Sequence, residues 1–397
     1  MSVDLRTRTD ADIPVVEAER FFGVDLPEMA TRRSDLVALA VDHLALRPLA
    51  IDVDGQSWRL EPDGDGIRVT PGIADATLAV TAERLADLVT DQVTPVGLMT
   101  AGEWTLDRDM RTVMDWWLVL RSLIDERPVH VPGAITVDAD LSRSFTLDED
   151  PAELRAFLEE AGFLHVRGVF SPDEMQRISA DMDVAEPTHT PGDGRSWWAT
   201  LADGTERVVR MQRFDDHSPT AGALLEDDRF IALGAVPGLG HEHPRTGRVN
   251  RIEALFKPLG VHQGISDVPW HKDCSLGRHS YECCSLTIGI SVTGAGPGSG
   301  QLRVVAGSHR ALVWPSLLDA GRLDLPEVPL ATETGDVTLH LSCTLHMAEP
   351  PTERERRVMY TGFSLPPPDP DAAAENRRRM HATRESAPLT TSQPPAG

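Results

Sequence analysis

The feature that most constrains the fold is a long stretch of short strands. From Ile252 to Phe363, runs rich in Val, Leu and Ile alternate with turns that contain Gly and Pro. This texture is typical of sandwiches and barrels built from antiparallel sheets. A helix, PAELRAFLEEAGF, and an apolar strand, LHVRGVF, come before it. We therefore predict a mainly β domain with flanking helices over residues 141–365.

The region before it has a different pattern. Turn sequences such as PDGDG separate three short alternating runs, at residues 57–60, 67–69 and 76–80. Thr81 is a good N-cap for the helix AERLADLV, residues 103–106 read as another strand, and Met110, Val113 and Trp117 lie on one side of an amphipathic helix. The sequence predicts a small α+β domain over residues 1–140. The Pro-rich residues 366–397 have too few apolar side chains to fold, and we predict that they are disordered.

Composition excludes several classes of protein. The 397 residues include 38 Lys and Arg against 62 Asp and Glu, a net charge of −24, which repels phosphate backbones and argues against nucleic-acid binding. No apolar run approaches the roughly 18 residues of a membrane span, and the N-terminus does not resemble a secretory signal. The four cysteines contain no CxxC pair, so we expect a cytoplasmic protein. The oligomeric state is not indicated.

The sharpest local motif is PWHKDCSLG, which contains His271 and Asp273. In a strand, side chains two residues apart point to the same face, so this imidazole and carboxylate can bind one metal ion. His346 lies near the end of a later predicted strand in GDVTLHLSCTLHMAEPP. Two histidines and one carboxylate form the facial triad of iron(II) oxygenases, which leaves coordination positions open for a 2-oxo acid and dioxygen.

Arginines that suit the other end of a 2-oxo diacid follow His346. Arg356 and Arg357 open the apolar strand RRVMYTGF, and a guanidinium binds a carboxylate through two hydrogen bonds. Alignment of the strand on Phe363 favours Arg356, whereas counting forward from His346 favours Arg357. Both remain candidates for binding the co-substrate.

Residues from about Ala152 to Phe363 resemble the phytanoyl-CoA dioxygenase family. The matching segments, in the family's order, are FLEEAGFLHVRGVFSPDEM, PWHKD, SGQLRVVAGSHR, and GD followed by TLH and the Arg strand. The resemblance implies a double-stranded β-helix (jelly-roll) fold, Fe(II) held by His271, Asp273 and His346, and 2-oxoglutarate as co-substrate. The chain departs from the family at His346-Met347-Ala348-Glu349, where members have a small polar run resembling HGSG.

The first region resembles the sterol carrier protein type 2 domain over about residues 34–125. The resemblance is carried by DATLAVTAERLADLV and by GLMTAGEWTLDRDMRTVMDWWLVL. It implies an apolar tunnel for a lipid or acyl chain and no catalytic residue.

Together the motifs predict a dioxygenase that hydroxylates a small apolar molecule with O2, forming succinate and CO2. Desaturation, epoxidation or ring formation are alternatives that share the iron centre. A further alternative is a lipid carrier whose oxygenase half is a silent scaffold.

Other histidines, cysteines and tryptophans have plainer interpretations. We expect His309 to anchor a turn and His340 to lie behind the centre or in the core. A solvated loop is expected for His241-Glu242-His243 with His217, and buried thiols for Cys283-Cys284 near His279. We expect Trp197-Trp198 to pack in the core or in a lid, since they lie in a Gly/Pro-rich stretch where lids over substrates are common.

Overall fold

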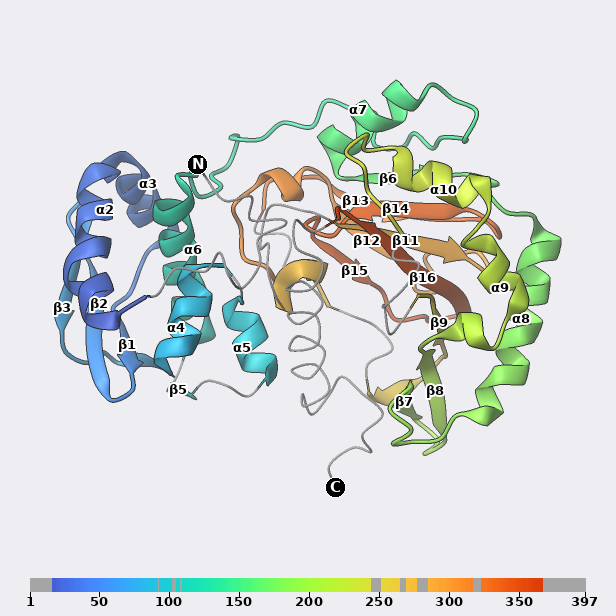
Figure 1. Ribbon diagram of the computed structural model, residues 1–397, viewed down its shortest axis with the longest axis horizontal. Coiled ribbons are helices and arrows are strands. Elements are labelled where there is room, and N and C mark those ends of the chain that lie inside the picture. Colours follow the sequence, from blue (N-terminus) through green and yellow to red (C-terminus); the bar gives the residue numbers. More distant parts are fainter. Residues whose placement is uncertain are drawn as a thin grey trace. The chain divides into compact units, whose positions relative to one another are not determined.

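The computed structural model describes residues 16–366, except 92, 102–104, 108, 244–250, 265–268, 277–284 and 317–322. The tail predicted to be disordered lies outside the described residues beyond Pro366. The chain forms two compact units (Figure 1). The first contains the chain up to Ile135 and two short later stretches, one of which is Arg310–Ser316; the second begins at Thr136. None of the described helices is long and apolar enough to span a membrane.

The first unit is built on one five-stranded sheet. Its strands lie in the order β3-β2-β1-β4-β5, with β1 and β4 parallel and the other neighbours antiparallel. The predicted strands at 57–60, 67–69 and 76–80 are confirmed, and the last has alternate residues buried, as a half-buried strand requires. The bounds are β1 Leu49–Val53, β2 Gln56–Asp63, β3 Gly66–Pro71, β4 Ala76–Val80 and β5 Thr105–Asp107.

Helices complete this unit. The side chain of Thr81 accepts a hydrogen bond from the amide of Arg84, so the predicted N-cap of α4 is confirmed. The predicted amphipathic helix is α6, and its buried residues Val113, Trp116 and Trp117 share an apolar core with the sheet. The helices are α1 Ala18–Arg20, α2 Leu26–Arg32, α3 Ser34–Leu44, α4 Ala82–Val89, α5 Pro95–Ala101 and α6 Met110–Asp125, with a π-helical turn, η2, at Phe21–Asp25.

A segment from far along the sequence belongs to the same unit. The amide of His130 donates to the carbonyl of Leu312 over 3.0 Å, and Val129 forms a β-bridge with Leu312. The indole Nε1 of Trp314 donates to Oδ1 of Asp115 on α6 over 3.1 Å. The segment Arg310–Ser316 is therefore fixed by both backbone and side-chain hydrogen bonds.

The second unit is rich in β-structure, as predicted. Eight antiparallel strands lie in the order β10-β7-β8-β9-β16-β11-β14-β6, and three more form a smaller sheet, β13-β12-β15. The large sheet contains β6 Phe163–Val166, β7 Ser196–Leu201, β8 Glu206–Met211, β9 Glu253–Lys257, β10 Val261–Gln263, β11 Ser285–Ser291, β14 Val337–Leu341 and β16 Arg356–Ser364. The small sheet contains β12 Leu302–Val305, β13 Glu327–Leu330 and β15 His346–Ala348.

Helices pack on one face of the large sheet; in Figure 1 the first of them lies beside β6 and the others lie on the side of β16 and β9. Ile288, Met359 and Phe363 belong to one apolar core together with residues of these helices. Since alternate residues of a strand point to opposite faces, the residues between them point to the other face, which bears the candidate site. The helices are α7 Pro151–Ala161, α8 Pro172–Ala185, α9 Pro219–Leu224 and α10 Asp228–Ala235. Short 3-10 turns are η3 Glu186–Thr188, η4 Phe214–Asp216, η5 Asp273–Leu276 and η6 Ser308–Arg310.

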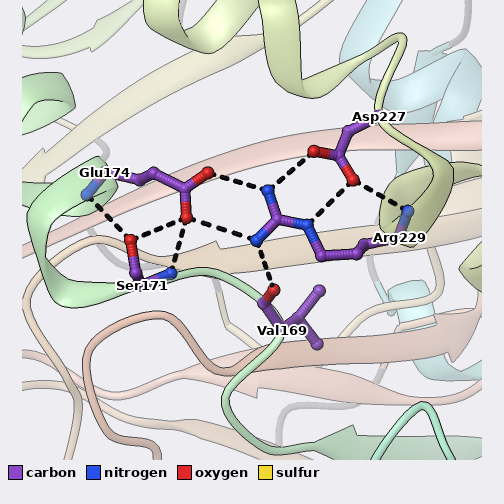
Figure 2. Close-up of polar contacts among 5 residues, drawn as sticks. All are labelled: Val169, Ser171, Glu174, Asp227 and Arg229. Atoms are coloured by element: carbon purple, nitrogen blue, oxygen red, sulfur yellow. Dashed lines mark hydrogen bonds and ion pairs between the residues drawn. The ribbon is translucent and has the colours of Figure 1, made fainter.

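An arginine joins the starts of two of these helices (Figure 2). The guanidinium of Arg229 donates to Glu174 and to Asp227 over 2.7 and 2.6 Å, and to the carbonyl of Val169 over 3.1 Å. Glu174 also forms a capping box with Ser171 at the start of α8. The hydrogen bond from Arg229 lowers the pKa of Glu174 to about 2. The carboxylate therefore stays charged, and the guanidinium is committed to holding α8 beside α10.

Candidate metal centre

Backbone pairing brings the two candidate histidines together. His271 and His346 form an antiparallel β-bridge, with the amide of each donating to the carbonyl of the other over 3.0 and 2.9 Å. Asp273 begins the turn η5, and its amide donates to the carbonyl of Ser342 over 2.9 Å. The expectation that His271 and Asp273 share one face of a strand is therefore wrong. A turn, held by Ser342 directly after β14, brings their side chains to one point.

The side chains of these three residues converge. The Nε2 atoms of His271 and His346 lie 3.5 and 3.4 Å from Oδ1 of Asp273. All three candidate ligand atoms lie within 4.8 Å of one another, and this is the one such cluster among the described residues. Two imidazoles and a carboxylate at this spacing fit the donor set of an iron(II) facial triad.

Hydrogen bonds orient both imidazoles toward this point. Nδ1 of His271 lies 2.7 Å from the carbonyl of Pro269, and Nδ1 of His346 lies 2.9 Å from the carbonyl of Thr344. A carbonyl accepts only, so each Nδ1 carries the proton and each Nε2 presents its lone pair. This arrangement is usual for histidines that bind a metal ion.

The electrostatics of the cluster favour the charge states that bind a cation. Burial lowers the pKa of His271, and the neighbouring His346 lowers it further. Burial alone would raise the pKa of Asp273, but His346 and the close polar contacts with His271 and His340 hold it well below its usual value. At neutral pH the site therefore presents a neutral His271 and a charged carboxylate.

The structure separates the two candidate arginines. Arg357 packs over the ring of Phe256, pairs with Asp183 over 2.8 Å and donates to the carbonyl of Ser179 over 2.9 Å, so its guanidinium is committed to α8. Arg356 is only 3% exposed, and its buried Nε and Nη2 have no hydrogen-bond partner among the described residues. A buried guanidinium with free donors fits the distal carboxylate of a 2-oxo diacid.

Strand register places Arg356 on the face of the triad. Thr287 of β11, whose Oγ1 donates to Oδ2 of Asp273 over 2.5 Å, is paired with Gly362 of β16. Alternate residues of β16 share a face, so Arg356, Tyr360 and Gly362 lie on the same side as Thr287. Lys257, which is also buried, is paired with Arg356 across β9. This face therefore carries two adjacent buried cations.

The face continues toward the edge of the large sheet. Arg210 of β8 is paired with Leu255 of β9 and with Trp197 of β7. The guanidinium of Arg210 lies 4.1 Å from the ring centroid of Trp197 and 3.2 Å from a carboxylate oxygen of Glu253. Both tryptophans belong to strand β7, and Trp198 packs against the apolar core of this unit, which confirms the alternative of core packing for that residue.

The remaining expectations have mixed outcomes. Nε2 of His309 lies 2.9 Å from the carbonyl of Glu159, which confirms an anchoring role. His243 contacts Phe230 and Phe363 and lies 3.0 Å from Oγ1 of Thr361, so the solvated loop expected there is wrong for this residue. Cys283, Cys284 and His279 lie outside the described residues.

Sequence reasoning missed two residues of the centre. Thr287 contacts Asp273 and Lys257 accompanies Arg356, and both positions depend on strand register. The only signal in the sequence was their place at alternate positions within predicted strands.

Comparisons with known proteins give consistent results. Residues 158–358 match the family model described as phytanoyl-CoA dioxygenase (PhyH). The multifunctional dioxygenase prhA of Penicillium brasilianum is 25% identical over 211 residues, covering 49% of this chain and 65% of that enzyme. The multifunctional dioxygenase ausE of Emericella nidulans is 26% identical over 211 residues, covering 49% and 66%. The match therefore spans slightly less than two thirds of each relative. The crystal structure of AviO1 from Streptomyces viridochromogenes is 22% identical, with a TM-score of 0.44, and the match covers 56% of this chain and 98% of AviO1.

Proposed function

This chain belongs to the phytanoyl-CoA dioxygenase family, and from that premise we propose that it uses iron(II), 2-oxoglutarate and O2 to hydroxylate a small, largely apolar molecule. Residues 158–358 are a 2-oxoglutarate-dependent, non-haem iron oxygenase domain. The observation that carries the proposal is the convergence of His271, Asp273 and His346 on the sheet face that bears the unpartnered Arg356. We further infer that the two sheets of the second unit are the walls of a double-stranded β-helix, within the domain predicted at 141–365.

In this proposal each residue of the centre has a defined task. His271, Asp273 and His346 hold the metal ion, which supplies the redox chemistry that couples the decarboxylation of 2-oxoglutarate to oxidation of the substrate. Arg356 binds the distal carboxylate of 2-oxoglutarate through its free donors, and Lys257 adds positive charge beside it. The carbonyls of Pro269 and Thr344 keep the imidazoles in the tautomer that the metal needs.

The same face of the sheet supports a site for the organic substrate. The ring of Tyr360 lies over Gly289, where an added Cβ would lie 3.0 Å from Cε1 of that ring. A larger residue at Gly289 would displace this ring. Trp197 and Arg210 extend the face further from the centre, and Nε1 of Trp197 is buried without a partner among the described residues. We propose that the substrate lies against this face and that Trp197 contacts it.

The first unit has its own proposed role. Its five-stranded sheet, its helices and its separate apolar core support a carrier-like domain that binds a lipid or acyl chain. This proposal covers the domain predicted at 1–140 and adds no catalytic residue.

The iron centre is tested by absorption spectroscopy without oxygen. We expect a weak metal-to-ligand charge-transfer band when iron(II) and 2-oxoglutarate are added to the full chain, and no band in His271→Ala. His189→Gln is a matched control, since His189 is buried against the carbonyl of Ala185 and does not belong to the cluster of candidate ligands. An unchanged band in His271→Ala would show that the ligand assignment is wrong.

The class of substrate is tested by product formation. With oxygen present, a true substrate should increase the formation of succinate above the background rate. A panel of lipid-like and polycyclic molecules that gave no increase would count against an apolar substrate.

A further inference from the structure

A third histidine lies beside the triad. His340 of β14 is 1% exposed, and the centroid of its ring lies 4.3 Å from that of His346. Its Nε2 lies 3.5 Å from Oδ2 of Asp273, and neither ring nitrogen has a hydrogen bond to a described residue. A buried imidazole without hydrogen bonds is costly, so its place beside a carboxylate calls for an explanation.

His340 does not belong to the set of candidate ligands. The cluster whose donor atoms lie within 4.8 Å of one another contains only His271, Asp273 and His346 among the described residues. His340 instead lies beside the oxygen of Asp273 that the other two imidazoles do not face. Nε2 of His271 and of His346 are paired with Oδ1, whereas Nε2 of His340 is paired with Oδ2.

Thr287 contacts the same oxygen. Its Oγ1 donates to Oδ2 of Asp273 over 2.5 Å and lies 3.1 Å from Oγ of Ser342. Thr287 and His340 are directly paired across β11 and β14, so the register of the large sheet places both side chains beside Oδ2. The two carboxylate oxygens therefore have different surroundings.

We propose that Thr287 and His340 form a clamp that holds Oδ2 of Asp273 and leaves Oδ1 as the single ligand atom of this carboxylate. The inference rests on the proposed iron centre. A carboxylate that bound the metal through both oxygens would take a coordination position that the co-substrate or O2 needs. Thr287 and His340 are thus positioning residues, since they act through Asp273.

Replacing both side chains of the clamp should weaken metal binding and change its geometry. In Thr287→Val with His340→Leu, we expect the affinity for cobalt(II), used as a spectroscopic probe, to fall roughly 10- to 100-fold, as is typical when such supporting hydrogen bonds are lost. The visible absorption of the bound cobalt(II) should also change, because its intensity depends on coordination number. A role in packing alone would lower stability and leave this spectrum unchanged.

Two single variants at Thr287 distinguish loss of the hydroxyl from loss of folding. Thr287→Val is nearly isosteric and removes only the hydroxyl, and Thr287→Ser restores it and should restore the spectrum. Thr338→Val is the matched control, since Thr338 lies on the same face of β14 but has its Oγ1 toward Gly289. We expect the control to bind cobalt(II) within about twofold of the wild type, well below the loss expected for the clamp variants.

The outcomes separate this inference from the function on which it rests. If the wild type binds cobalt(II) and Thr287→Val and His340→Leu both leave affinity and spectrum unchanged, the clamp is wrong and the iron centre stands. If the wild type binds no cobalt(II), the proposed centre itself is overturned.

Discussion

Two neighbouring arginines show how strand alternation assigns different roles to identical residues. Arg356 and Arg357 are adjacent on β16 and therefore point to opposite faces of the large sheet. Arg357 is hydrogen-bonded to Ser179 and paired with Asp183, whereas Arg356 is buried with free donors. The sequence left both open, and burial on the face of the triad distinguishes them.

Arg356 should therefore control the affinity for 2-oxoglutarate. In Arg356→Lys the charge remains but the two parallel hydrogen bonds are lost, so we expect KM for 2-oxoglutarate to rise about 10- to 100-fold, equivalent to roughly 1.4–2.8 kcal/mol. Arg357→Lys should lower stability and leave this KM nearly unchanged. Measurement of succinate formation against 2-oxoglutarate concentration gives KM for each variant. A larger rise of KM in Arg357→Lys than in Arg356→Lys would reverse the assignment.

At this scale, the sequence could predict the residue types of the centre but not its supporting contacts. His271, Asp273 and His346 stand in motifs with characteristic neighbours. Thr287 and His340 contact Asp273 because β11 and β14 pair in one register, and a shift by one residue would turn both away. Register depends on the whole sheet, so their contacts could not be predicted from the local sequence.

At the scale of elements, helix α6 contains a carboxylate in an unfavourable environment. Asp115 is 5% exposed, and burial raises its pKa from 3.8 to about 6, despite the ion pair with Arg111 and the hydrogen bond from Trp314. Between these two pH values the folded protein holds more protons at this site than the unfolded chain. The free energy of unfolding therefore falls as the pH rises through that range, by about 3 kcal/mol in total.

Replacing Asp115 should stabilise the protein at neutral pH. Asp115→Asn removes the charge and keeps an acceptor for the indole of Trp314, so we expect a gain of about 3 kcal/mol at pH 7.5 that falls to about half near pH 5. The apparent melting temperature, measured at both pH values, checks this. Asp42→Asn, at an exposed position of α3, should change little at either pH. An equal gain at both pH values would contradict the explanation.

Most elements could be predicted because their signals are local. The cap Thr81, the alternation of β4 and the apolar stripe of α6 each require only neighbouring residues. The Gly/Pro-rich stretch around Trp197 indicated a loop, but pairing with β8 makes it a strand with a bulge. Pairing between segments overrode the local turn signal there.

At the scale of the whole molecule, a single domain boundary along the sequence does not separate the two units. The sequence placed the boundary near residue 140, and the structure divides the chain between Ile135 and Thr136. It also assigns Arg310–Ser316 to the first unit, through contacts such as that between His130 and Leu312. Contacts between segments so far apart leave no trace in local composition.

The proposed carrier role predicts a binding activity separate from the iron centre. A fluorescent fatty acid should bind the full chain saturably and be displaced by its unlabelled counterpart. Because the first unit has its own apolar core, His271→Ala should bind the probe as well as the wild type does. Absence of saturable binding, or its loss in His271→Ala, would contradict this role.

The reciprocal hydrogen bonds between His271 and His346 affect how the enzyme binds its metal ion. The two imidazoles are brought together by main-chain pairing, so the entropy of ordering them is lost when the polypeptide folds and not when the ion arrives. The metal site should therefore be preformed in the folded apoprotein. The protein should be able to bind iron after synthesis and to exchange it without unfolding. Conversely, a partly folded chain in which this bridge is open would have no means of retaining the ion.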